Sequence, residues 1–177
     1  RDIIHVLAAN FQKEEPYYNE AIFYWRYQDG EFTKSCELLP SLNRDHVSDG
    51  GTNNYVFMLY DPANPNRVSF LLNTPWADGK AVISDDNGDS WNDRVFYQHP
   101  GINETYASAF MYPRWTTAVF DANDNLNVVY EWNGSSGAPG EGGYYPGLGS
   151  VGFWSETLPK SEDCLGGIGN GGEPFIM

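Results

Sequence analysis

The chain of 177 residues is long enough for one domain with a sizeable core. It carries 24 acidic and 10 basic residues, which argues against a nucleic-acid partner, because polyphosphate binding needs clustered Lys and Arg. The longest apolar runs are short, so no membrane span is expected. We interpret the net charge of −14 as a solubility device, with an extracellular or calcium-rich setting as the alternative.

Strand-like segments recur along the chain in the order strand, turn-rich insertion, strand. The leading strand of each unit ends on an asparagine, namely Asn10, Asn73 or Asn133, and these lie 63 and 60 residues apart. The spacing predicts an internal repeat of this length. The strand pairs are 5–10 with 21–26, 68–73 with 80–84, and 127–133 with 150–155.

Two units show a further strand before the asparagine strand. These strands cover 55–60 and 116–120, and each runs into a turn rich in Asp and Asn, residues that close hairpins. A strand over 94–98 completes the middle unit. Since no segment shows sustained helical periodicity, we expect an all-β chain of about three four-stranded antiparallel units, the first and last incomplete.

We place these units at about 1–45, 46–105 and 106–160. The stretch Gly134–Gly149 is predicted to be a long Gly-rich loop, and 161–177 a Gly-rich tail or the start of a further segment. Cys36 and Cys164 have no metal-ligand neighbours, so they predict no zinc site. They are either one disulfide or two unrelated buried thiols.

The middle unit contains the motif Ser84-Asp-Asp86-Asn-Gly88-Asp-Ser-Trp91. It resembles the Asp-box of sialidases and related BNR-repeat β-propellers. In such a turn Gly88 permits a positive φ, Asp86 accepts turn amides, Ser84 ties the strand end to that carboxylate, and Trp91 caps an apolar layer.

The resemblance implies a fold and a structural role for the motif, away from any active site. A degraded copy lies at Trp25–Phe32, and Phe153–Glu156 keeps only the strand and the serine. Propellers close with four to eight blades, so three units imply further blades from a longer chain or from partner subunits.

We therefore expect a non-catalytic, secreted or cell-envelope propeller module that binds glycans or proteins, resembling bacterial surface proteins. The alternative is a sialidase-like glycoside hydrolase with most catalytic residues elsewhere. That family uses an arginine triad for the substrate carboxylate, a Tyr paired with a Glu as nucleophile, and an Asp as acid/base. No complete set of these residues can be assigned in this sequence.

The candidate ligand-binding residues are cations and aromatics on segments that join successive units. They are Arg44, His46 and Asp49 in one segment, and Tyr112, Arg114 and Trp115 in the other. The cations suit an acidic ligand and the aromatics suit a sugar face. Each also has a simpler interpretation, as a loop ion pair or as packing between blades.

No cofactor is expected, and calcium is the alternative. Asp121, Asn123 and Asn125 mimic the oxygen-rich spacing of calcium loops. The acid that an EF-hand places at its twelfth position is missing, because Trp132 stands there. A hairpin turn is the competing explanation of these residues.

Overall fold

The structure is a computed structural model that describes residues 3–10, 21–39, 55–74, 77–98, 110–136 and 143–157. Within these ranges the chain is all-β, with ten strands in three antiparallel sheets. The described residues include no helix long and apolar enough to cross a membrane. The expected all-β chain with three antiparallel units is thus confirmed in this part of the protein.

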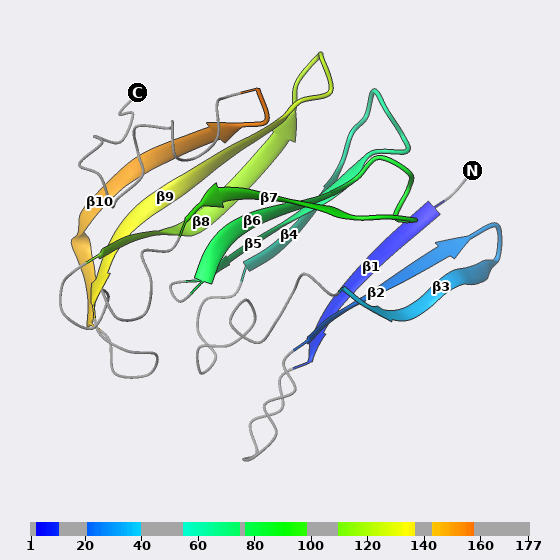
Figure 1. Ribbon diagram of the computed structural model, residues 1–177, viewed down its shortest axis with the longest axis horizontal. Coiled ribbons are helices and arrows are strands. Elements are labelled where there is room, and N and C mark those ends of the chain that lie inside the picture. The colour runs from blue at the N-terminus through cyan, green and yellow to red at the C-terminus, as the bar shows by residue number, and fades with distance from the viewer. Residues whose placement is uncertain are drawn as a thin grey trace.

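The three sheets lie side by side, with the four-stranded sheet between two three-stranded ones (Figure 1). We name them the N-terminal sheet (β1-β2-β3), the central sheet (β4-β5-β6-β7) and the C-terminal sheet (β8-β9-β10). The strands are β1 (Ile3–Asn10), β2 (Ala21–Gln28), β3 (Glu31–Leu38), β4 (Tyr55–Tyr60), β5 (Val68–Thr74), β6 (Ala77–Ser84), β7 (Asn92–Tyr97), β8 (Phe110–Phe120), β9 (Leu126–Ser136) and β10 (Gly143–Ser155).

The central sheet is buried on both faces, which explains why Val68–Leu72 is an almost unbroken apolar run. Phe70 and Leu72 pack with Tyr24 of the N-terminal sheet, whereas Leu71 packs towards the C-terminal sheet. That second core is the larger of the two. It contains Leu71, Ala81, Ile83, Phe96, Tyr97, Phe120, Leu126, Val128, Tyr130 and Trp154.

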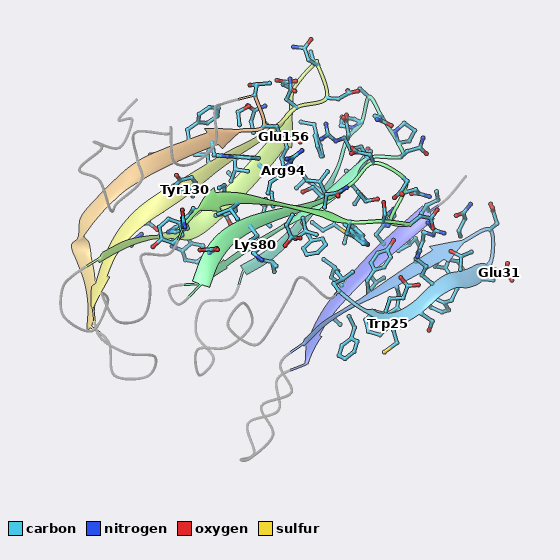
Figure 2. All side chains as sticks on the ribbon, viewed as in Figure 1. Trp25, Glu31, Lys80, Arg94, Tyr130 and Glu156 are labelled. Carbon is cyan, nitrogen blue, oxygen red and sulfur yellow. The ribbon has the colours of Figure 1, made fainter. Side chains whose placement is uncertain are left out.

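Buried residues alternate with more exposed ones along the strands of the C-terminal sheet, as is typical of a sheet with one covered face. Val128, Tyr130 and Trp154 point into the core, and Figure 2 shows Tyr130 between the two sheets. Gly152 faces the Tyr130 ring so closely that a Cβ would overlap it. Glycine is therefore required at this point of β10.

Strand β3 was not predicted, because Glu31–Leu38 is rich in polar residues. It forms by pairing antiparallel with β2, in a register that shifts near Arg26. Cys36 adopts a φ of 54° in this strand, and its thiol is exposed and free. The interpretation of Cys36 as a buried thiol is therefore wrong, and Cys164 lies outside the described residues.

The Gly-rich loop predicted at Gly134–Gly149 is wrong at both ends. Strand β9 continues to Ser136 and β10 already begins at Gly143, with Gly143 opposite Ser136. Glycine and serine both have the backbone N–H and C=O groups that the hydrogen bonds of a β-ladder require. A register shift between Tyr145 and Gly149 accommodates the residues of β10 that have no partner on β9. Composition alone cannot reveal this pairing.

The alignment of the three repeat units on Asn10, Asn73 and Asn133 is out by one residue in the first unit. Phe70 and Tyr130 each lie three residues before their asparagine, and both pack against the sheet that precedes them in the chain. Leu7, three residues before Asn10, packs instead against the central sheet, which follows it. Because side chains alternate across a strand, a one-residue offset reverses the face.

A mostly buried arginine links the central and C-terminal sheets. Arg67 Nη2 donates to both carboxylate oxygens of Glu156 at 2.8 and 2.9 Å, and Nε lies 2.9 Å from Asp85 Oδ1. The guanidinium lies 5.2 Å from the centre of the Phe120 ring. Glu156 also accepts the Leu126 amide at 2.6 Å. The Arg67–Glu156 ion pair therefore connects the turn before β5, the turn before β9 and the turn after β10.

We expect Arg67→Met and Glu156→Gln each to lower the free energy of unfolding by about 1–3 kcal/mol, because each leaves a mostly buried charge without its partner. The double variant should lose less than the sum of the two. Urea denaturation of all three proteins measures this coupling. Arg94→Met, at an exposed position of β7, is the matched control and should change stability by under about 0.5 kcal/mol. Additive losses would contradict a direct Arg67–Glu156 interaction.

Candidate functional site

The segment Ser84–Trp91 connects β6 to β7, the last two strands of the central sheet. The Ser84 hydroxyl donates to Asp86 Oδ1 at 2.8 Å and accepts the Gly88 amide at 2.7 Å. Asn87 and Gly88 have φ values of 61° and 83°. The predicted tight turn, with a positive φ at Gly88, is confirmed.

Asp86 forms further hydrogen bonds within this turn. Its Oδ1 accepts the Ser90 amide at 2.7 Å, and its Oδ2 accepts the Ser90 hydroxyl at 2.6 Å. Desolvation opposes the charge, but the hydrogen bonds from Ser90 and Ser84 outweigh it and lower the pKa of Asp86 to about 2. Because its oxygens are occupied within the turn, the structure gives Asp86 a turn-stabilising role.

The same turn forms part of the contact between the central and N-terminal sheets. Trp91 packs edge-on against Tyr24 and Phe70, with ring centres 5.1 Å apart in both pairs. Arg26 Nη1 donates to the Asn87 carbonyl at 2.7 Å and lies 3.1 Å from Asp89 Oδ1. Trp91 is half-buried, as predicted from the motif.

Sequence reasoning missed Arg26 and Arg67, the two arginines at the sheet contacts. One signal for Arg26 was present, because strand alternation places it on the same face as the buried Tyr24. A charge on a buried face requires a partner, and here the partner is the turn of the next sheet.

His5 and Tyr24 form the most enzyme-like pair among the described residues, with Nδ1 2.7 Å from the phenol oxygen. Burial raises the pKa of Tyr24 above its usual range. Burial also lowers the pKa of His5. Both groups are therefore neutral at pH 7, and the buried phenol does not suit nucleophilic attack.

Tyr112, Arg114 and Trp115 lie within strand β8, so the prediction that these three are on a segment joining two units is wrong. Tyr112 and Arg114 are on β8, opposite Asn133 and beside a register shift, and their side chains are not among those described. Trp115 follows them and is exposed. Arg44, His46 and Asp49 lie outside the described residues, so the structure does not relate the two groups to each other.

The weak calcium candidate forms the hairpin turn between β8 and β9. Asp121 Oδ1 accepts the amides of Asn123 and Asn125 at 2.8 and 3.0 Å. These backbone hydrogen bonds lower the pKa of Asp121. In the described part of the chain, no group of three or more His, Cys, Asp or Glu side chains is arranged to hold a metal ion. The contacts of Asp121 therefore match the hairpin-turn explanation.

No protein-family model, curated protein or solved structure matches this chain. A function must therefore be argued from the residues and contacts described above.

We expect Gly88→Ala to destabilise the protein more than Gly30→Ala, by about 1–3 kcal/mol. Both glycines have a positive φ, so both variants incur the same kind of backbone strain. A Cβ on Gly88 would overlap the Tyr24 phenol, whereas one on Gly30 would meet nothing within 4 Å. Urea denaturation of the two variants makes the comparison. Equal losses would show that the turn does not pack against Tyr24.

The carboxylate of Asp86 predicts an acid-dependent contribution to stability. Its pKa of about 2 lies below its ordinary value of 3.8, so the contribution is complete above about pH 4 and disappears as the pH falls towards 2. Asp86→Asn should therefore be less stable than wild type at pH 6, and the gap should close by pH 2. Urea midpoints across this range test the trend. Ser90→Ala, which keeps the amide donor, should give a smaller gap, and a gap independent of pH would contradict the assignment.

Proposed function

We propose that this chain is a run of three β-propeller blades that acts as a non-catalytic binding module of a larger extracellular or cell-envelope protein. The observation that carries the proposal is the Ser84–Trp91 turn. It joins the last two strands of a four-stranded antiparallel sheet and packs against a neighbouring sheet. An Asp-box would have this position and these contacts.

The proposed binding surface is at the end of the sheets opposite this turn. Figure 1 shows the β4–β5, β6–β7 and β8–β9 turns towards one common end. The residues Tyr112–Trp115 are in the first half of β8, away from its turn. The Trp115 indole is exposed, and Arg114 precedes it in the sequence. These residue types suit an acidic glycan, because an indole stacks on a sugar face and an arginine pairs with a carboxylate.

The alternative function is a sialidase-like hydrolase with catalytic residues mostly outside this chain. It needs a nucleophilic Tyr–Glu pair and several convergent arginines. Arg26 and Arg67 are already engaged in ion pairs at the sheet contacts. This supports the binding module over the enzyme.

We expect purified protein to release no fluorophore from a fluorogenic sialoside above the rate of an Arg114→Ala control. The same protein should bind 3′-sialyllactose more tightly than lactose in calorimetry. Trp115→Ala should weaken that binding about tenfold, the value of one aromatic contact. Tyr60→Ala, which removes an exposed aromatic at the turn end of β4, is the control. Turnover that depends on Arg114 would overturn the non-catalytic proposal, and equal effects of both aromatic variants would overturn the proposed surface.

A further inference from the structure

Two turns of neighbouring sheets meet at the contact between the central and C-terminal sheets. The β4–β5 turn runs from Asp61 to Arg67, and the Asp61 amide donates to the Arg67 carbonyl at 2.9 Å. The Arg67 guanidinium lies 5.2 Å from the ring centre of Phe120, the last residue before the β8–β9 turn. Figure 1 shows both turns at the same end of their sheets. This arrangement brings acidic side chains of the two turns together.

Asp61 is a buried acid with one unsatisfied carboxylate oxygen. The residue is 1% exposed, and its Oδ1 accepts the Ala63 amide at 2.8 Å. Its Oδ2 is also buried and has no hydrogen-bond partner among the described residues. A buried carboxylate needs a donor or a cation at each oxygen, because removing its charge from water is unfavourable. Oδ2 of Asp61 therefore requires a further partner.

The group in contact with Asp61 is a second carboxyl group, which has no hydrogen to donate when ionised. This is Asp124 of the β8–β9 turn, whose side chain interacts directly with that of Asp61. Burial, and then the charge of Asp61, raises the pKa of Asp124. The Asp124 amide donates to the Asp121 carbonyl at 3.1 Å, so the turn holds Asp124 in place. Two carboxylates held in contact repel each other unless a proton or a cation compensates their charge.

The neighbouring arginine does not compensate this pair. Arg67 lowers the pKa of Asp124, but burial and the charge of Asp61 outweigh its effect. Its Nη2 donates to both carboxylate oxygens of Glu156, and its Nε lies 2.9 Å from Asp85 Oδ1. One guanidinium thus already serves two carboxylates. Within the described residues, the charges of Asp61 and Asp124 are left without a cation of their own.

From these contacts we propose that Asp61 Oδ2 and the Asp124 carboxylate bind a divalent cation, with calcium the best match. Calcium takes oxygen ligands in flexible geometry and accepts main-chain carbonyls and waters among them. Such ligands complete the shell here, because the pair supplies only two carboxylates. Asp121 is not a ligand, since its two oxygens accept amides of Asn123 and Asn125. The proposed site is therefore distinct from the calcium loop expected from the sequence, and it joins the turns of two sheets.

The test is a calcium titration of the full chain after treatment with a chelator, followed by calorimetry and by thermal unfolding. Wild type should bind calcium with a Kd of about 10⁻⁴–10⁻³ M and should gain thermal stability from it. Asp61→Asn keeps an oxygen for the Ala63 amide but removes the charge, so it should bind at least about tenfold more weakly. Sodium chloride at equal ionic strength controls for screening of the net charge of −14.

Glu31→Gln is the matched control, because it removes an exposed carboxylate of the N-terminal sheet, apart from these turns (Figure 2). It should bind calcium as wild type does. In chelator, Asp61→Asn should be at least as stable as wild type, because its amide donates to Asp124 instead of repelling it. Asp124→Asn serves if the first variant does not fold, since asparagine tolerates the φ of 63° at this position.

The proposal fails if calcium does not stabilise wild type, or if both asparagine variants respond to calcium as wild type does. It also fails if wild type ignores calcium but becomes more stable between about pH 7 and about pH 5, because a shared proton then compensates the pair. An equal loss of binding in Glu31→Gln would show unspecific association with the acidic surface. The site does not depend on the glycan, so calcium binding without sialyllactose binding would count against the proposed function alone.

Discussion

The burial of the central sheet on both faces is the constraint on which the rest of the structure depends. Strands β5 and β6 carry apolar side chains towards both neighbours, so the central sheet needs a partner sheet on each side to leave water. Phe70 and Val82 need the N-terminal sheet, and Leu71 and Ile83 need the C-terminal one. The stacked order of the sheets follows from this requirement.

Polar contacts fix how each pair of sheets is aligned, since apolar packing is not directional. In both contacts a mostly buried arginine of the earlier sheet reaches a turn of the later sheet. Arg26 reaches Asn87 and Asp89, and Arg67 reaches Glu156. Arg26 lies within β2 and Arg67 lies in the turn before β5, so the two arginines occupy different positions in their sheets.

The sequence was informative where local chemistry determines the structure. The turn at Ser84–Trp91 could be predicted because its hydrogen bonds lie within eight residues, and most strands could be predicted from their apolar residues. Strand β3 could not, since Glu31–Leu38 becomes a strand only by pairing with β2. The pairing of Gly143 with Ser136 is equally invisible in composition. The candidate ligand-binding residues remain a prediction, because Arg44, His46 and Asp49 and the side chains of Tyr112 and Arg114 lie outside those described.

The acidity of the chain also has a structural component beyond solubility. Asp86 and Asp121 accept turn amides, and Glu156 accepts both an amide and the guanidinium of Arg67. A turn with several amides pointing inward favours a carboxylate in the ionised form, as the lowered pKa values of the two aspartates show. A repeat whose turns each use such an acid accumulates negative charge with every added unit. The excess of 24 acidic over 10 basic residues is thus partly a consequence of building the chain from aspartate-closed turns.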